Sequence, residues 1–192
     1  VIIAPGITDE ARAIFKTKNN LRVLILTSLH EKNNSQNFKS IEGGILVQSN
    51  DDESTDKSDL KVVTEKKPSD SEIEDMLFAF KVCKHVKSNA IIYVKNKKTI
   101  GIGAGQMSRV DSAKIASQKN SEMEKSEENS LENSVVASDA FFPFADGLLV
   151  TISSGAKAVI QPGGSVKDDE VIEAANKAGI SMVFTGTRHF RH

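Results

Sequence analysis

Residues 101–116, "GIGAGQMSRVDSAKIA", combine three glycines, an arginine and the start of a helix. A strand that leads through glycines into Ser108 and Arg109 presents backbone N–H groups and one cation, which together suit a carboxylate or a phosphate. Gln106 and Arg109 are the side chains that would contact such an anion. The stretch lacks the last glycine of a dinucleotide-binding fingerprint. A tight structural turn is therefore the competing interpretation.

A second candidate is the aromatic stretch "SDAFFPFADG" at 138–147, where Asp139 and Asp146 flank Phe141, Phe142 and Phe144. Phenylalanines this close together are typical of a hydrophobic core. They could equally form a wall for a flat heteroaromatic ligand, with a ring for stacking and a carboxylate that accepts hydrogen bonds from amino and ring N–H groups. The residues leave both interpretations open.

Two further stretches carry polar groups near turns. "QPGGS" at 161–165 precedes a predicted helix and is either another anion cradle or simply a turn. The tail "TGTRHFRH" at 185–192 places four basic or imidazole side chains within five positions. Its simplest interpretation is an exposed basic tail.

Zinc chemistry is not expected. The single cysteine, Cys83, excludes an internal disulfide framework and a site with several cysteine ligands. His30-Glu31 lacks the second histidine of a zincin helix, and the zinc-deaminase signature H-x-E with P-C-x-x-C is missing from the sequence.

Composition bounds the remaining function classes. The 192 residues, 39% of them hydrophobic and 27% charged, predict a globular protein with one core. A formal charge of -1 gives no broad basic field for nucleic acid. No apolar run approaches the roughly 20 residues that span a bilayer, and no secretory leader opens the chain, so we expect a cytoplasmic protein without a membrane partner. The start at Val1, inside an apolar run, indicates a piece of a longer chain.

The elements that must position these residues alternate between strands and helices. The first residues, "VIIA", predict a short buried strand, followed by a helix capped by Thr8 with Ala11, Ile14 and Phe15 on one face, and "LRVLIL" predicts a second strand. The clearest helix starts with the capping-box spacing of Ser69 and Glu72. Its apolar stripe is Ile73, Met76, Leu77, Phe80 and Cys83, so Cys83 is expected to be a buried hydrophobe and not a nucleophile.

Strands are predicted at 90–94, 98–103, 134–138, 157–162 and 181–185, and helices at 110–118 and 168–179. "GLLVTISSG" has the β-branched residues of a strand. We nevertheless predict a helix there, because parallel neighbours need a crossover connection. Residues 49–59 and 118–134 are predicted to be loops. The alternation indicates an α/β fold, a layered mixed sheet flanked by helices.

Read together, "KHVKSNAI", "GIGAGQMSRVDSAKIA", "SDAFFPFADG", "AVIQPGGS" and "MVFTGTRHFRH" closely resemble, in this order, the C-terminal part of a bifunctional purine-synthesis enzyme family. That family combines aminoimidazole carboxamide ribonucleotide transformylase with inosine monophosphate cyclohydrolase. The resemblance covers nearly the whole chain, including "VIIAPG" and "GGILVQ". It implies a cytidine-deaminase-like fold without zinc, with residues 1–192 as the second transformylase unit. The cyclohydrolase domain and the first unit would lie outside these residues.

The resemblance also implies an activity, the transfer of a formyl group from 10-formyltetrahydrofolate to the amino group of the imidazole ribonucleotide. Asn89 matches the asparagine that hydrogen-bonds the formyl oxygen, and His192 matches a histidine near the reacting amine. Phe141 and Asp146 match the ring and the carboxylate that hold the folate. Arg109 and Arg188 match the polar contact of the substrate site and a ribonucleotide-binding arginine.

Two departures from the family pattern limit what the resemblance implies. Asp139 and Ser88 match positions that help bind a monovalent cation in some members, but Val86 and Ala90 replace hydroxyl residues there, which argues against the ion. The family's catalytic Lys-His pair lies in the first unit and is followed by a proline turn. Lys84-His85 is followed by "VKSN", and we interpret it as the structural counterpart of that pair.

The resemblance implies partners as well, namely the ribonucleotide, the first transformylase unit and a second subunit in a homodimer. Two alternatives stay open. The same fold could grip a nucleotide or folate without chemistry, or it could be a structural half that supports dimerisation.

Overall fold

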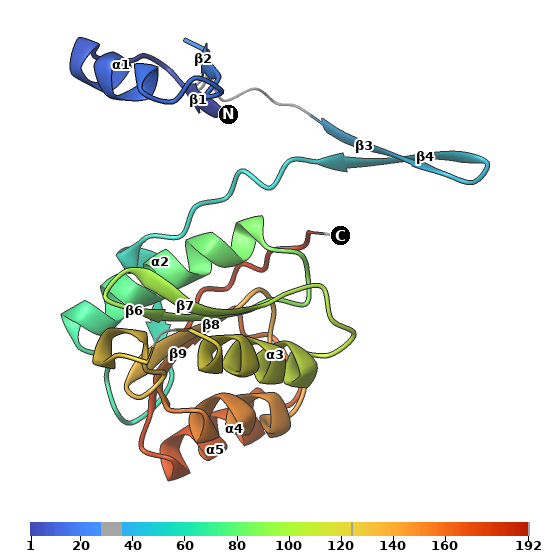
Figure 1. The fold of residues 1–192 in the computed structure, drawn as a ribbon. Coiled ribbons are helices and arrows are strands. Elements are labelled where there is room, and N and C mark those ends of the chain that lie inside the picture. The colour runs from blue at the N-terminus through green and yellow to red at the C-terminus, as the bar shows by residue number, and fades with distance from the viewer. Residues whose placement is uncertain (28–35, 124, 192) are drawn as a thin grey trace. The chain divides into compact units, whose positions relative to one another are not determined.

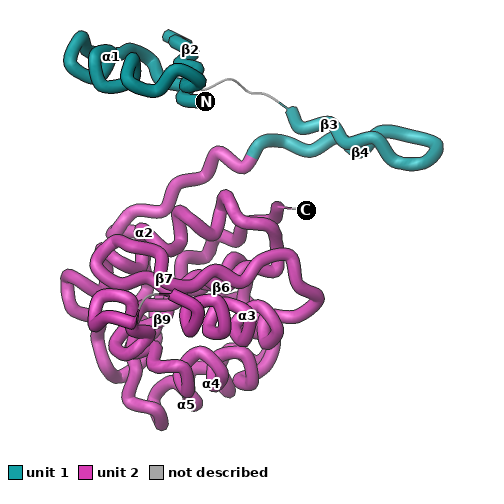
Figure 2. The backbone as a smooth tube through the Cα atoms, viewed as in Figure 1, with its two compact units in different colours: residues 1–50 teal, residues 51–192 magenta. Residues whose placement is uncertain are grey.

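A computed structural model describes residues 1–27, 36–123 and 125–191. The chain divides into two compact units, residues 1–50 and residues 51–192 (Figure 2). All buried side chains among the described residues lie in unit 2, so the expected core belongs to that unit.

Unit 1 contains a parallel strand–helix–strand motif and a hairpin. Strands β1 (Ile2–Ala4) and β2 (Val23–Ile25) pair in parallel and are connected through helix α1 (Asp9–Lys16). The predicted cap is confirmed, because the Ala11 N–H donates to Thr8 Oγ1 at 3.2 Å. The hairpin consists of β3 (Gln36–Ile41) and β4 (Gly44–Ser49), which pair antiparallel.

No described residue of unit 1 is buried. The prediction of a buried first strand is wrong, since Ile3 is 55% exposed and Ile2 half-buried. On the helix, Ala11 and Phe15 are half-buried while Ile14 is 66% exposed. The sequence pattern is that of a core element, but two short strands and one helix provide no second layer to cover it.

Unit 2 is built on a mixed six-stranded sheet with the order β5-β10-β9-β8-β6-β7. The strands are β5 (Lys61–Val62), β6 (Ile91–Lys95), β7 (Lys98–Gly103), β8 (Ser134–Ser138), β9 (Ala156–Gln161) and β10 (Ser181–Phe184). Strands β8, β9 and β10 are mutually parallel, whereas β6 pairs antiparallel with both of its neighbours. The predicted α/β fold with a layered mixed sheet is confirmed.

Helices cover both faces of this sheet (Figure 1). Helix α2 (Asp70–His85) packs on one face, and α3 (Arg109–Ser121), α4 (Ala145–Ser153) and α5 (Asp168–Lys177) pack on the other. Strand β6 shows the strand period of two, because Ile92 packs towards α2 while Ile91 and Tyr93 pack towards the opposite layer. The predicted helix at 147–155 is confirmed as α4, the crossover between β8 and β9.

The segments predicted as loops are largely irregular. Residues 49–59 include the end of β4 and a short 3-10 helix, Lys57–Asp59. Residues 118–134 include the end of α3 and a second 3-10 helix, Glu127–Asn129. Over the described ranges, no helix has both the length and the apolar character needed to cross a membrane.

Candidate functional site

The glycines of β7 allow α3 to pack closely on the sheet. A Cβ added at Gly101 would lie 2.7 Å from the Ala116 carbonyl oxygen, and one at Gly103 would overlap the Ser112 carbonyl. Both glycines are thus explained by the close approach of strand and helix. Ser108 caps α3, with its Oγ accepting a hydrogen bond from the Asp111 N–H at 3.0 Å. A tight structural turn and close packing therefore explain the glycines, but they do not explain Arg109.

Asn89 lies in the connection between α2 and β6 and is held by the turn after β7. Its side-chain Nδ2 donates to the Gln106 carbonyl at 2.9 Å, and its own carbonyl accepts from Ser112 Oγ at 2.8 Å. The peptide bond before it, Ser88–Asn89, is cis. The amide group has two N–H donors, so one hydrogen bond fixes its direction while the second N–H stays available in this half-buried position.

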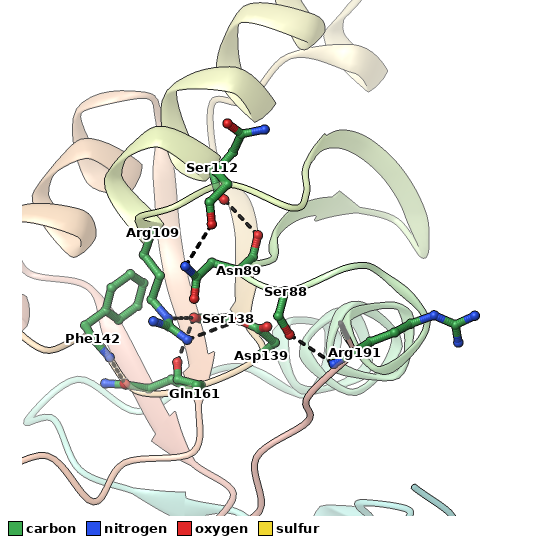
Figure 3. A network of polar contacts seen from close by, with 11 residues as sticks. Ser88, Asn89, Arg109, Ser112, Ser138, Asp139, Phe142, Gln161 and Arg191 are labelled. Carbon is green, nitrogen blue, oxygen red and sulfur yellow. Dashed lines mark hydrogen bonds and ion pairs between the residues drawn. The ribbon is translucent and has the colours of Figure 1, made fainter. Parts of the chain in front are cut away.

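Arg109, in the first turn of α3, reaches the end of β8 (Figure 3). Its Nε donates to Ser138 Oγ at 3.1 Å, and Nη2 lies 3.4 Å from Asp139 Oδ1. The side chain is only 13% exposed. Burial lowers the pKa of the guanidinium from its ordinary value, and the Asp139 carboxylate opposes that change. Arginine remains charged under these conditions, so a partly buried cation with N–H donors to spare stands at the edge of the sheet.

Asp139 connects three parts of this region. The residue is fully buried, and its backbone N–H donates to the Ala90 carbonyl at 3.3 Å while its own carbonyl accepts from the His189 N–H at 2.9 Å. A buried carboxylate is costly unless it is paired, and Arg109 supplies the pairing charge. Asp139 therefore fixes the start of β6, the first turn of α3 and the C-terminal tail relative to one another.

A monovalent cation receives limited support from these residues. Asp139 Oδ2 has no hydrogen-bond partner among the residues that the structure describes, which would suit a cation. Ser88 Oγ, however, accepts the Arg191 N–H at 3.1 Å, and the guanidinium of Arg109 already neutralises Asp139. We assign no chemistry to a cation here. Within the described ranges, no group of three or more histidine, cysteine, aspartate or glutamate side chains could hold a metal ion.

Of the three phenylalanines at 141–144, one belongs to the hydrophobic core and two are at least partly accessible to a ligand. Phe142 is fully buried in the core, and its backbone N–H donates to Gln161 Oε1 at 2.9 Å. Phe141 is half-buried, and Phe144 is 54% exposed. Asp146 is exposed in the first turn of α4, where its Oδ1 accepts the Gly147 N–H at 2.7 Å. Phe141 and Asp146 are thus accessible to a ligand, whereas Phe142 is not.

Helix α4 packs beside α3 near Arg109. A Cβ added at the neighbouring Gly147 would lie 3.7 Å from Arg109 Cβ and 3.0 Å from the Phe142 ring. The N-terminal turns of α3 and α4 therefore adjoin.

Two backbone N–H groups of the turn at 161–165 are already hydrogen-bonded to a side chain of the protein. Both oxygens of the Asp168 carboxylate accept backbone hydrogen bonds there, from the Gly164 N–H at 2.7 Å and the Ser165 N–H at 3.2 Å. These are the donors that an anion would need, so the turn interpretation is favoured.

The C-terminal tail is only partly the exposed basic tail that the sequence predicts. Arg188 and Arg191 are exposed, and the Arg188 guanidinium lies 4.5 Å above the Phe190 ring. His189, in contrast, is 3% exposed, and its Nδ1 lies 2.6 Å from Asp51 Oδ2. The prediction is wrong for His189 because the core offers an aromatic surface, Phe80, on which its ring packs. His192 lies outside the described residues.

Cys83, Lys84 and His85 are the last three residues of helix α2. Cys83 is buried, and burial raises the pKa of its thiol well above the ordinary value, which confirms the core assignment and disfavours a thiolate. Lys84 Nζ donates to the Glu53 carbonyl at 2.7 Å and lies 3.8 Å from Asp51 Oδ1, while His85 is exposed.

The structure therefore pairs Arg109 with Asp139, bonds the Asp139 N–H to the carbonyl of Ala90, the residue after Asn89, and places Asp146 on a helix that adjoins α3. Arg188 is not part of these contacts. Sequence reasoning missed Ser112, Ser138 and His189. The helical spacing of three from Arg109 could have indicated Ser112, and the position beside Asp139 could have indicated Ser138. No sequence signal pointed to the burial of His189.

Comparisons with known proteins find matches to one family. The family model described as "AICARFT/IMPCHase bienzyme" matches residues 1–119. Proteins named "Bifunctional purine biosynthesis protein PurH" match all of this chain, with 57% identity over 196 residues in Cereibacter sphaeroides, 58% over 197 in Rhodospirillum rubrum and 59% over 196 in Parvibaculum lavamentivorans. The chain spans 36 to 37% of the length of these relatives.

Proposed function

The chain belongs to the AICARFT/IMPCHase bienzyme family, and on that premise we propose that it is the second, C-terminal unit of the transformylase. In this role it takes part in moving a formyl group from 10-formyltetrahydrofolate to the amino group of aminoimidazole carboxamide ribonucleotide, on the route to inosine monophosphate. The complete protein would act in the cytoplasm.

The observation that carries this proposal is the anchoring of Asn89. The hydrogen bond to Gln106 fixes the amide, and the bond from Ser112 fixes the backbone beside it. The second amide N–H can then meet the formyl oxygen without reorganisation. When the amine attacks the formyl carbon, negative charge develops on that oxygen, and a donor already in place stabilises the charge.

The adjoining side chains suit the two substrates. Phe141 offers a ring for stacking on the pterin, and Asp146 offers a carboxylate to its amino and ring N–H groups. Arg109 supplies a partly buried cation in the first turn of α3, which adjoins α4. Arg188 and His192 are assigned to the ribonucleotide, with His192 near the reacting amine.

The unit is incomplete for catalysis in this proposal. The attacking amine must lose a proton, and the family's Lys-His pair that would accept it lies in the first unit. Lys84 is engaged with Glu53 and Asp51, which supports its interpretation as a structural counterpart. The partners are therefore the first unit and a second subunit of a homodimer.

The experiment measures steady-state formyl transfer by the complete protein and by two variants. Asn89→Ala is expected to lower kcat by about 100-fold with little change in either KM, because the donor acts mainly in the transition state. Asp146→Asn is expected to raise the KM for the folate by about tenfold or more, through the loss of a charge-assisted hydrogen bond.

Lys84→Ala is the control, and we expect it to leave kcat at saturating substrates unchanged. A complete protein that binds both substrates without turnover would favour the non-catalytic binding module. A complete protein that binds neither would favour the structural dimerisation half. Turnover by residues 1–192 alone that Lys84→Ala abolishes would show Lys84-His85 to be the catalytic pair.

A further inference from the structure

His189 is a buried imidazole in a tail whose other basic side chains face solvent. Its ring packs on Phe80 of α2, with centroids 4.7 Å apart and planes inclined by 48°. Nδ1 lies 2.6 Å from Asp51 Oδ2, within hydrogen-bond distance. An imidazole that is 3% exposed and has both an aromatic and a carboxylate partner can occupy only one orientation.

The backbone around His189 is fixed as well. The His189 N–H donates to the carbonyl of Asp139, the residue that pairs with Arg109. Two residues later, the Arg191 carbonyl accepts the Ser88 N–H at 2.8 Å, and the Arg191 N–H donates to Ser88 Oγ at 3.1 Å. The tail is therefore bonded to Asp139, which belongs to the candidate site, and to Ser88, which precedes Asn89.

The direction of Arg188 follows from the burial of His189. Arg188 is exposed, His189 is buried and Phe190 is 37% exposed, so the side chains alternate as they do along an extended chain. When His189 is held on the inner side, Arg188 must project from the outer side. Phe190 then supports the guanidinium from below at 4.5 Å.

Asp51 is itself held in place. Lys84 Nζ lies 3.8 Å from Asp51 Oδ1 and donates to the Glu53 carbonyl at 2.7 Å, so the last turn of α2 fixes the segment that carries the carboxylate. Asp51, Lys84 and His189 line the same cavity of about 470 Å³. Removing His189 would leave Asp51 with the more distant Lys84 as its charged partner.

We propose that His189 is a positioning residue for the ribonucleotide. The Asp51–His189 pair clamps the tail against α2 and thereby directs Arg188 towards the substrate, without His189 touching the substrate itself. The inference rests on the proposed function, because the role of Arg188 comes from it.

The test uses the complete protein with His189→Leu, which removes both ring nitrogens, and His189→Asn, which keeps an N–H donor near the place of Nδ1. His189→Leu is expected to raise the KM for the ribonucleotide and its calorimetric Kd by about tenfold. The KM for the folate should stay within about threefold, because Phe141 and Asp146 lie on another segment. His189→Asn should recover most of the lost affinity.

His85→Leu is the matched control, since it makes the same change at an exposed histidine that lines the same cavity. It should leave both KM values unchanged. Unchanged ribonucleotide affinity in His189→Leu would overturn the inference. An equal rise of the two KM values in His189→Leu, together with a lower melting temperature, would also overturn the inference. So would a ribonucleotide affinity of His189→Asn as low as that of His189→Leu.

Ribonucleotide binding and formyl transfer by the wild-type protein distinguish a failure of the proposed function from a failure of the clamp formed by Asp51 and His189. Ribonucleotide binding without formyl transfer would contradict the proposed function and leave the clamp to be decided by the Kd values. If the wild type binds no ribonucleotide, both are wrong. Normal turnover in wild type and in His189→Leu alike, with equal Kd values, would contradict the clamp alone.

Discussion

The two units contain the same local motif and bury it to different extents. In unit 1, β1–α1–β2 is a parallel strand–helix–strand motif, and in unit 2, β9–α5–β10 is another. Val159 and Met182 in the second motif are fully buried, whereas Ile3 and Leu24 in the first are each 55% exposed. The apolar pattern of the sequence thus specifies which strand or helix forms. Whether its side chains are buried depends on the layers of structure that pack against it.

The hairpins repeat this contrast. In β6–β7, Ile91 and Tyr93 are fully buried between α3 and the rest of the sheet. In β3–β4, Phe38 is 68% exposed and Ile45 66% exposed. A two-stranded hairpin alone is marginal in water, and three or more strands or a packed helix are needed for independent stability.

The largest difference is expected when the two units are separated. Residues 51–192 should unfold cooperatively on heating, with a free energy of unfolding within about 1 kcal/mol of the 192-residue chain, because the removed part contributes no buried side chain. Residues 1–50 should show no cooperative transition. Circular dichroism melting of the three chains checks this. A sharp transition in residues 1–50 would contradict the comparison.

A smaller difference is expected for matched phenylalanine truncations. Phe80→Ala in unit 2 should lower the free energy of unfolding by about 3 to 5 kcal/mol, since a 1% exposed ring leaves a cavity. Phe38→Ala in unit 1 should change it by less than about 0.5 kcal/mol. Urea denaturation of the 192-residue chain measures both. Equal effects would mean that the ring of Phe38 is covered in solution.

The smallest effect concerns Tyr93, the single tyrosine of the chain. Burial raises the pKa of its hydroxyl to about 12, whereas an unfolded tyrosine has a pKa of about 10. The folded state therefore keeps the proton longer. The associated stability is fully present below pH about 10 and is lost as the pH rises towards 12, by about 2 to 3 kcal/mol.

Ultraviolet titration of the phenolate measures this pKa directly. Tyr93→Phe is the control, because it removes the titrating group while lysine residues still titrate in the same range. Relative to Tyr93→Phe, the wild type should lose about 2 to 3 kcal/mol of its free energy of unfolding as the pH rises through this window. A midpoint near 10 in the folded protein would show that Tyr93 is accessible to water and would weaken the contrast with unit 1.

Much of the fold could be predicted from local signals. Thr8, Ser69 and Ser108 begin helices as N-caps, and the predicted strands of unit 2 appear close to their expected bounds. These features depend on neighbours within four residues, which the sequence contains. Strand β5 and hairpin β3–β4 were missed, because β5 has two residues and the hairpin has no covered face to impose an alternating pattern.

The candidate site was predicted in part. Arg109 was indicated by the glycine turn, whereas Asn89 came from the family resemblance and Asp139 from the phenylalanine stretch. The structure pairs Arg109 with Asp139 and bonds Asp139 to Ala90, the residue after Asn89. That Asp139 is the partner of Arg109, and that the loop at Ser88 binds the tail, could not be predicted. These contacts connect residues 30 or more positions apart, which no periodicity encodes.

The sequence by itself determined the elements, the α/β class and the apolar stripes, because caps, turns and hydrophobic period act over a few residues. The tertiary structure alone decided which apolar segments are buried and that His189 turns inward. Burial depends on surfaces brought together from distant parts of the chain. Asp51 and His189 are separated by 138 positions, and only the folding of α2 between them places the carboxylate and the imidazole within hydrogen-bond distance.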